Sequence, residues 1–488
     1  MTNSPQKFDF DNSYARDLSG FYAEWQGAAA PAPKVLLVNT ALATSLGLDP
    51  HALKSSAQEL SGAVAPEGAT PLAMAYAGHQ FGGFSPQLGD GRALLLGEIF
   101  DTQGARFDLH LKGSGRTPFS RGGDGKAVLG PVLREYLMGE AMHALGIPTT
   151  RALAATTTGE NVARDGMKQG AVLARIAASH LRVGTFQFFA ARNDWEKVRQ
   201  LANYAIARHD PDLVDAPDTY LAFLTRVADR QAALVANWLH VGFVHGVMNT
   251  DNVTISGETI DYGPCAFIDA YDVNAVFSSI DRNGRYAFGK QPVMAQWNLT
   301  RLAEALLPLI DADDTDRAIR LATDVINGFT GRYTDLWTAG MRAKIGLSAA
   351  QDGDSALIND LFAAMDGQGV DYTQFFRRLA SDTDQDIAAL FDNDSKIIAW
   401  LADWRARLLR DPQQAQARLD AMNAVNPVYI ARNHLVEQAL QAAEAGDMAP
   451  FQKLLAVLSH PFSKVRGLEA FEGPAPASFG AYQTFCGT

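Results

Sequence analysis

The hydrophobic periodicity changes near residue 180, and this change constrains the fold more than any other feature of the chain. Before residue 180, apolar runs of strand length lie at 92–100, 106–112, 150–157 and 170–177. One segment in this part, 128–145, has a helical period instead. After it, amphipathic helical segments dominate, at 218–241, 295–310, 316–337, 396–409 and 429–444. A short β hairpin is predicted at 252–261, where it interrupts the helical part of the chain. The pattern predicts an α+β fold.

The same change suggests how the chain divides. We assign residues 1–60 to an N-terminal extension, whose first 34 residues we expect to be an extended arm. Residues 61–185 form a strand-rich N-lobe, and residues 186–488 form a mainly helical C-lobe that includes C-terminal helices and a Cys-containing tail.

The charge balance excludes one broad class of partner. Of the 488 residues, 42 are Lys or Arg and 54 are Asp or Glu, which gives a net charge of −12 without any long basic run. Nucleic-acid binding requires clustered cations, so we expect no nucleic-acid partner. The sequence has no secretory signal and no apolar window long enough for a membrane helix. We therefore expect a cytoplasmic protein without a membrane partner.

A glycine-rich turn precedes the strand at 92–100. It contains Gly89, Gly91 and Arg92. Glycine lets the backbone approach a phosphate closely, and the neighbouring arginine adds positive charge. A plain surface turn accounts for these residues equally well.

Lys112 ends the strand at 106–112, and a helix with two candidate acidic partners follows it. These partners are Glu135 and Glu140. A Lys–Glu pair between a strand and the next helix is the arrangement that holds the phosphate-binding lysine of protein kinases. Spacing alone does not choose between the two glutamates.

Residues 240–263 carry the most chemical information. A long helix is followed by a loop with Asp251 and Asn252 and then by Asp261-Tyr262-Gly263, a pattern typical of the kinase catalytic loop and metal-binding Asp. The kinase base would lie five residues before the Asn, where this chain has Val247. Asp251 is the only carboxylate within the loop. Because the usual base is missing, a degenerate kinase fold that binds nucleotide without catalysing a reaction stays open as an alternative.

Two arginines are also candidates for phosphate binding. Arg175 lies inside the apolar strand 170–177, and Arg182 follows seven residues later. A buried guanidinium needs a partner, and either a phosphate or a protein carboxylate would serve.

Long stretches of the chain resemble the selenoprotein O family, whose members are protein adenylyltransferases with a pseudokinase fold. The matching stretches cover most of the chain, at 75–92, 109–153, 174–189, 245–267 and 426–440. The resemblance implies a protein-kinase-like bilobal fold. It also implies transfer of AMP from ATP to Ser, Thr or Tyr hydroxyls of proteins, with ATP inverted relative to kinases and with release of pyrophosphate.

The resemblance assigns roles residue by residue. Asp251 would be the proton acceptor, and Asn252 and Asp261 would hold Mg²⁺ or Mn²⁺. Lys112 would contact phosphate and be oriented by Glu135 rather than Glu140. The remaining ATP site would be lined by Gly89, Gly91, Arg92, Asp124, Gly125, Arg175 and Arg182.

Two other functions remain open at this point. One is an atypical kinase that moves the γ-phosphate, although Val247 argues against it, and the other is an inactive scaffold that binds ATP. Some family members carry a selenocysteine near the C-terminus, where this chain has Cys486. Cys265 follows the metal-binding Asp, and we favour two unrelated thiols over a disulfide between them.

Overall fold

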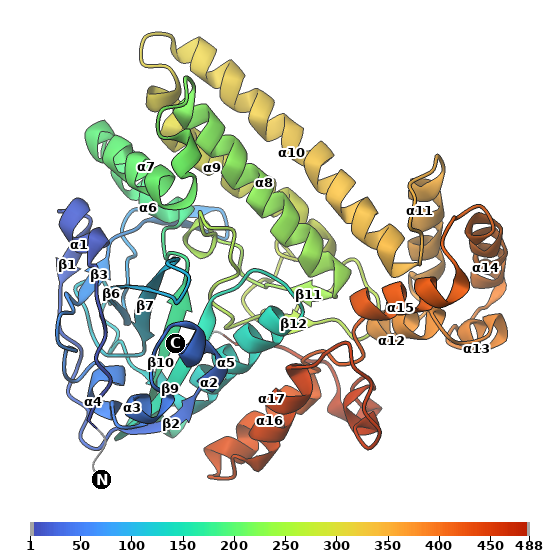
Figure 1. The fold of residues 1–488 in the computed structure, drawn as a ribbon, viewed down its shortest axis with the longest axis horizontal. Coiled ribbons are helices and arrows are strands. Elements are labelled where there is room, and N and C mark those ends of the chain that lie inside the picture. Colours follow the sequence, from blue (N-terminus) through green and yellow to red (C-terminus); the bar gives the residue numbers. More distant parts are fainter. Residues whose placement is uncertain (1–3, 486–488) are drawn as a thin grey trace.

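The computed structural model describes residues 4–485, and an antiparallel sheet of eight strands occupies their N-terminal part (Figure 1). The strand order is β1-β3-β6-β7-β10-β9-β2, and β8 pairs with β10. The strands are β1 (Tyr22–Glu24), β2 (Lys34–Val38), β3 (Leu72–Met74), β6 (Ala93–Phe100), β7 (Arg106–Lys112), β8 (Ala127–Val128), β9 (Arg151–Arg164) and β10 (Gly166–Ala177). Two small two-stranded sheets pair β4 (Gly78–Gln80) with β5 (Gly83–Ser85) and β11 (Phe243–Val244) with β12 (Ala266–Phe267).

The predicted strand pair before Lys112 is confirmed. Strands β6 and β7 pair with Ala93 opposite Lys112 and Phe100 opposite Arg106. The Asp101 carboxylate closes the turn between them, because its Oδ1 accepts from the backbone N–H groups of Gln103 at 2.9 Å and Ala105 at 2.8 Å.

Each face of the sheet packs against a different layer. On β10, Val172, Ala174 and Ile176 point into a cluster that also contains leucines of α2 (Thr40–Ser45), α3 (Pro50–Lys54) and α4 (Ala57–Leu60). The alternating position Leu173 belongs to the main core, which includes the buried side of α5 (Leu129–Ala144). Helix α5, predicted at 128–145, is thereby confirmed, and it lies against β9 and β10 (Figure 1).

Helices follow from residue 183 onward, which confirms a mixed α and β fold. They are α6 (Val183–Ala190), α7 (Trp195–His209), α8 (Thr219–His240), α9 (Gln291–Ile310), α10 (Thr315–Lys344), α11 (Asp354–Met365), α12 (Tyr372–Leu379), α13 (Asp384–Ala388), α14 (Ser395–Leu408), α15 (Ala415–Val425), α16 (Asn433–Glu444) and α17 (Ala449–Leu458). Helices α8, α9 and α10 pack side by side, while α16 and α17 pack near α5 (Figure 1).

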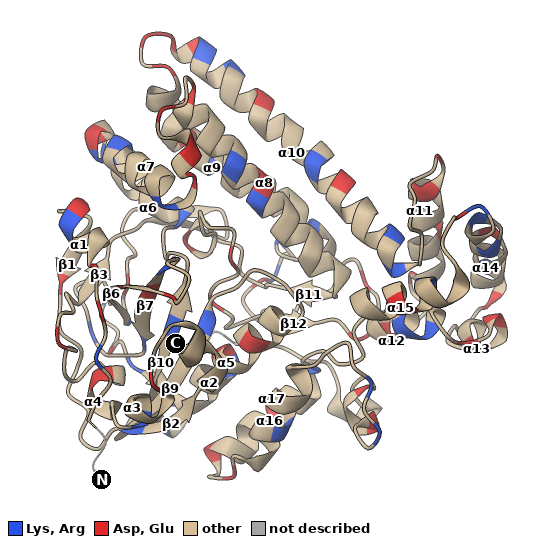
Figure 2. Ribbon diagram, in the orientation of Figure 1, with Lys and Arg blue, Asp and Glu red and all other residues tan. Residues whose placement is uncertain are grey.

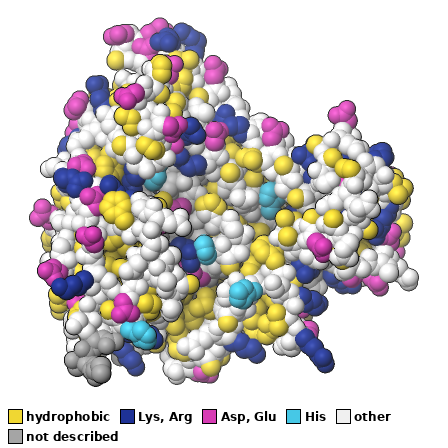
Figure 3. Space-filling view, viewed as in Figure 1, with side chains coloured by type: hydrophobic (Ala, Val, Ile, Leu, Met, Phe, Trp, Pro, Cys, Tyr) yellow, Lys and Arg dark blue, Asp and Glu magenta, His cyan; other side chains and the backbone are white. Residues whose placement is uncertain are grey.

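The outer surface carries charges of both signs. Basic and acidic positions are interspersed along α10 (Figure 2) and over the face shown in Figure 3. This mixture is typical of a water-facing surface. Among residues 4–485, no helix combines the length and apolarity that a membrane crossing requires.

The prediction of an extended N-terminal arm is wrong. Residues of this segment form α1 (Ser13–Asp17) and β1, which pairs with β3. Glu98 of β6 holds α1, because its Oε1 accepts from the Ser13 hydroxyl at 3.0 Å and the Tyr14 backbone N–H at 2.7 Å. Tyr14 is buried against the main core, and this burial ties the segment to the sheet.

The hairpin predicted at 252–261 is also wrong. Its backbone pairs with distant segments instead of with itself, through isolated bridges between Thr254 and Arg182 and between Thr259 and Thr149. The Thr254 hydroxyl donates to the Glu258 carbonyl at 2.7 Å and accepts from the Glu258 N–H at 3.0 Å. These side-chain bonds close the turn that a strand ladder was expected to close.

Candidate active site

Five charged side chains meet between β7, β10, α5 and the segment that follows residue 260. Lys112 Nζ donates to Glu135 Oε2 at 2.6 Å and also bonds Asp261 Oδ1. Arg175 Nη1 lies 3.0 Å from Glu135 Oε1 and 2.9 Å from Asp261 Oδ1. Arg182 Nη1 lies 2.9 Å from Asp261 Oδ2. We call these five residues the charge cluster.

Strand alternation explains why the cluster forms on this face of the sheet. On β7, Leu109 and Leu111 point into the core under α2–α4, so His110 and Lys112 point to the opposite face. On β10, Arg175 shares its face with Leu173 and therefore points towards α5. Helix α5 supplies Glu135 from its buried side.

The cluster combines three cations with two carboxylates, so its formal charge is 3 − 2 = +1. Burial alone would raise the pKa of the Asp261 carboxyl, but Lys112, Arg175 and Arg182 hold that pKa well below its usual range. Asp261 also has a φ of 64°, in the left-handed region that non-glycine residues rarely adopt. An ionised Asp held in a costly conformation is typical of a functional position.

Asp251 lies beside the charge cluster, in the single turn Thr250–Asn252. Its carbonyl oxygen accepts from Arg182 Nη1 at 2.6 Å, and its carboxylate Oδ2 accepts from Gln80 Nε2 at 3.3 Å. Within residues 4–485, its Oδ1 is buried without a hydrogen-bond partner. Burial raises the pKa of Asp251 to about 6, which suits a group that accepts a proton near neutral pH.

The position of the kinase base is occupied by the buried side chain of Val247, which accepts no proton. Asn252 Nδ2 donates to the Val247 carbonyl at 3.1 Å, and no hydrogen bond from residues 4–485 occupies the amide oxygen of Asn252, which can therefore bind another ligand. Together with Asp261, Asn252 offers the hard oxygen donors that Mg²⁺ prefers. No cluster of three or more His, Cys, Asp or Glu poised for a metal occurs in the described part of the chain. The donor set fits an ion that phosphates and water also ligate.

The glycines of the two predicted phosphate-binding turns are sterically required. Gly89 has a φ of 88°, and a Cβ there would lie 2.4 Å from the Phe119 ring. Gly125 has a φ of 68°, and its Cβ would lie 2.2 Å from the Gly115 carbonyl oxygen. The structure therefore explains both glycines by packing, and their role towards phosphate stays a prediction.

The predicted residues next to those glycines lie in different surroundings. Gly91 is packed under the Phe119 carbonyl, and the Arg92 carbonyl accepts from the Gly113 N–H at 2.7 Å at the end of β7. Asp124 is exposed and forms two bonds of 2.8 Å with Arg164. That guanidinium lowers the pKa of Asp124 to about 2. The structure does not join Asp124 to the charge cluster by any contact among the described residues.

Glu140 lies elsewhere, although it shares α5 with Glu135. Its two carboxylate oxygens accept from Arg151 at 2.8 and 2.7 Å, so it anchors the start of β9. Lys112 therefore pairs with Glu135, a choice that spacing left open.

Three residues near the site went unrecognised in the sequence: Gln80, Asp90 and His110. His110 Nδ1 accepts from Arg175 Nε at 3.3 Å, and its Nε2 bonds Asp90 Oδ2 at 3.0 Å. Asp90 and His110 are fully buried behind the charge cluster. The sequence signal for His110 was its position between two leucines of a strand, because a polar side chain buried in a sheet needs a hydrogen-bond partner.

The thiol after Asp261-Tyr262-Gly263 is sequestered. Cys265 is buried and its Sγ donates to the Tyr262 carbonyl at 3.1 Å. Burial raises the pKa of the Cys265 thiol to about 12, which suppresses the reactive thiolate. Cys486 lies outside the described residues, so the expectation of two unrelated thiols stays a prediction.

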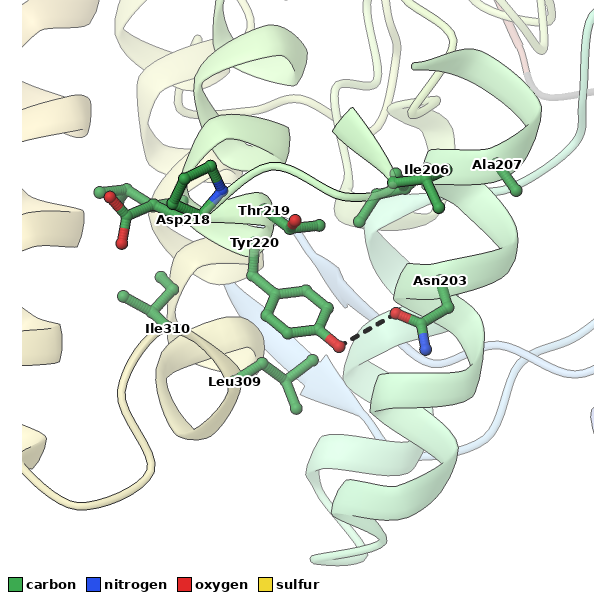
Figure 4. A pocket seen from close by; sticks show the side chains of 11 residues that line it. Asn203, Ile206, Ala207, Asp218, Thr219, Tyr220, Leu309 and Ile310 are labelled. Carbon is green, nitrogen blue, oxygen red and sulfur yellow. Dashed lines mark hydrogen bonds between the residues drawn. The ribbon is translucent and has the colours of Figure 1, made fainter. Parts of the chain in front are cut away.

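A surface cavity of about 610 Å³ lies apart from the charge cluster, between α7, the start of α8 and the end of α9 (Figure 4). Tyr220 points across it and donates to Asn203 Oδ1 at 3.0 Å. Among the described residues that line it, Asp218 is the one charged group, and none is Lys or Arg. The cavity lacks the cations that bind phosphate groups, whereas the charge cluster contains three.

Comparison with known proteins identifies the family. The family model described as "Protein adenylyltransferase SelO" matches residues 5–459. The chain belongs to the SelO family. A protein from Cereibacter sphaeroides named "Protein nucleotidyltransferase YdiU" is 62% identical to this SelO-family chain, over 99% of the chain and 100% of the relative. A Rhizobium johnstonii protein of the same name is 55% identical over 100% of both chains. This SelO-family chain is an enzyme of the nucleotidyltransferase class.

Proposed function

We propose that this enzyme transfers AMP from ATP to Ser, Thr or Tyr hydroxyls of proteins. ATP would bind inverted relative to a kinase, so that the α-phosphate faces the acceptor and pyrophosphate leaves. The observation that carries this proposal is the placement of Asp251, the one loop carboxylate, against Arg182 of the charge cluster, while the kinase base position holds Val247.

The fold we propose is protein-kinase-like and bilobal. Residues 1–60 would form an N-terminal extension, residues 61–185 the N-lobe and residues 186–488 the C-lobe. The pairing of a strand-end lysine with a glutamate of the following helix supports this assignment, because kinases fix their phosphate-binding lysine in the same way.

In the proposed step, Asp251 takes the proton of the acceptor hydroxyl. The hydroxyl oxygen then forms a bond to the α-phosphorus, and the bond from that phosphorus to the bridging oxygen of the β-phosphate breaks. The electron pair of that bond leaves with pyrophosphate. A positioned base contributes about 10²–10⁴-fold to such a transfer.

The charge cluster would hold the leaving group. Lys112, Arg175 and Arg182 would neutralise the β- and γ-phosphates, and the net charge of +1 favours an anion there. The rest of the ATP site would be lined by Gly89, Gly91, Arg92, Asp124 and Gly125.

Asn252 and Asp261 would hold a Mg²⁺ or Mn²⁺ ion together with the phosphates. When bound, this ion would neutralise phosphate charge as the leaving group departs. Asp261 would have to exchange part of its contacts with Lys112 and Arg175 for the ion, and the incoming phosphates offer those two cations new partners.

The experiment compares ATP labelled at the α-phosphate with ATP labelled at the γ-phosphate, using purified enzyme, Mg²⁺ or Mn²⁺ and a cell lysate. We expect label on protein from the α-phosphate alone, and its loss in Asp251→Ala with ATP binding retained. Label from the γ-phosphate alone would establish an atypical kinase. ATP binding without transfer of either label would favour an inactive scaffold.

A further inference from the structure

A rim of aromatic side chains borders the catalytic loop on the side of the β4–β5 hairpin. The His79 and Phe84 ring centroids lie 4.8 Å apart, and the Trp297 ring of α9 meets His79 edge-on at 5.2 Å. At the hairpin tip, Phe81 lies 5.2 Å from Tyr286, which is buried and supports the rim from within. We call these five residues the aromatic rim.

The aromatic rim is fixed to the loop that carries Asp251. Asn249 Oδ1 accepts from the Phe81 N–H at 3.0 Å and from the Tyr286 hydroxyl at 2.6 Å. The His79 N–H donates to Thr250 Oγ1 at 2.7 Å. A segment lying on the rim would therefore lie beside Asp251 in a fixed geometry, at little cost in loop ordering.

Arg285 lies at this rim, where its guanidinium contacts two aromatic rings. Its guanidinium lies 4.7 Å from the Trp297 ring centroid and 5.7 Å from that of Tyr286. Within residues 4–485, Arg285 makes no ion pair with a carboxylate. Arg301, whose guanidinium lies 5.1 Å from the same ring centroid, is by contrast paired with Glu304 at 2.7 Å.

The backbone around Arg285 is also held in place. The buried Asp281 carboxylate accepts from the N–H groups of Arg285 and Tyr286, at 2.8 Å each. Both oxygens of this carboxylate bind backbone N–H groups of the turn. Among the described residues, the Asp281 carboxylate forms no hydrogen bond with the Arg285 guanidinium. A partly buried guanidinium that has no carboxylate partner among the described residues can donate charge-assisted hydrogen bonds to a carboxylate of another molecule.

We propose that the aromatic rim is the docking surface for the acceptor segment of protein substrates, and that Arg285 selects segments with Asp or Glu next to the modified hydroxyl. This inference rests on the proposed function, since it names the substrate class of the same site. The exposed Phe84 ring and the partly exposed side chains of His79 and Trp297 suit an extended peptide, and Arg285 supplies charge complementarity.

The test uses two fluorescein-labelled peptides that are identical except that Glu or Lys flanks a single Ser. Peptide affinity is measured by fluorescence anisotropy, and AMP transfer is measured with α-labelled ATP. We expect the wild-type enzyme to bind the Glu peptide about tenfold more tightly than the Lys peptide, as one charge-assisted contact would give.

The charge reversal Arg285→Glu is expected to invert this preference, and Arg285→Gln to abolish it. Arg320→Glu is the matched control, because Arg320 is exposed on α10 and carries the same change of charge. Equal preference in the wild-type enzyme, an unchanged preference in Arg285→Glu, or the same inversion in Arg320→Glu would overturn the proposal. So would a weakened affinity for ATP in Arg285→Gln with the peptide preference intact, since Arg285 would then serve the nucleotide.

Peptide preference and AMP transfer separate the two proposals. If the wild-type enzyme prefers the Glu peptide through Arg285 but transfers no AMP, the docking surface stands and the proposed function fails. If AMP is transferred without regard to flanking charge, the proposed function stands and the docking surface fails. Thermal unfolding midpoints of the three variants establish that each is folded.

Discussion

Replacing Glu135 by Gln should slow AMP transfer far more than the same replacement at Glu140, although both residues lie on α5. Glu135 accepts from Lys112 at 2.6 Å and from Arg175 at 3.0 Å, and 9% of its side chain is exposed. Gln keeps one acceptor oxygen, so one of two charged hydrogen bonds is lost. A bond of this kind contributes about 1.5–3 kcal/mol, which corresponds to a loss of roughly 10- to 200-fold in kcat/KM.

The two kinetic constants should respond differently to Glu135→Gln. Removing one carboxylate raises the formal charge of the charge cluster from +1 to +2, which favours binding of the triphosphate. Lys112 is at the same time held less firmly, so kcat carries the loss while ATP affinity is retained or increases. Glu140→Gln weakens a pair with Arg151 away from the cluster, so we expect a lower free energy of unfolding and unchanged kinetics.

The assay combines initial rates with α-labelled ATP, ATP affinity by calorimetry, and urea unfolding of both variants. Equal kinetic losses in Glu135→Gln and Glu140→Gln would refute the reasoning, since α5 would then act only as a scaffold. A loss of ATP affinity without a loss of kcat in Glu135→Gln would also contradict it.

The packing and charges of the described residues lead to four further predictions. Gly331→Ala in α10 should raise the free energy of unfolding by about 0.5–1 kcal/mol, because a Cβ there meets nothing within 4 Å. Gly340→Ala in the same helix should lower it by about 1–3 kcal/mol, because its Cβ would lie 2.1 Å from the His240 ring; equal effects in urea unfolding would contradict both. Burial lowers the pKa of His240 to about 4, below its unfolded value of about 6.5, so its contribution to stability is complete above pH 6.5 and is lost as pH falls towards 4. His240→Gln should therefore flatten the decline in stability over that range by up to about 3 kcal/mol, and an unchanged pH profile would count against this. Asp261→Asn should remove the Mg²⁺ dependence of ATP binding, and titrations that still differ with and without MgCl₂ would contradict the metal assignment.

Much of the fold was predictable from local patterns. The strands at 92–100 and 106–112, the helix at 128–145 and the long helices beyond residue 218 all appear where their periodicity placed them. Periodicity is a local property, because the side chains of a strand or helix alternate along the chain whatever they later contact. The failures were segments whose hydrogen bonds go to distant partners: the N-terminal segment held by Glu98, and residues 252–261, which bridge to Thr149 and Arg182.

The sequence by itself determined which residue types were available for chemistry: a strand-end lysine, two arginines and a loop with Asp251, Asn252 and Asp261 but no kinase base. Only the tertiary structure decided how they combine. It paired Lys112 with Glu135, left Oδ1 of Asp251 without a hydrogen-bond partner among the described residues, and joined the aromatic rim to the loop that carries Asp251. The physical reason is that a charged side chain takes its partner from whatever the folded chain brings within about 3–4 Å, and sequence spacing fixes that distance only within one helix or strand.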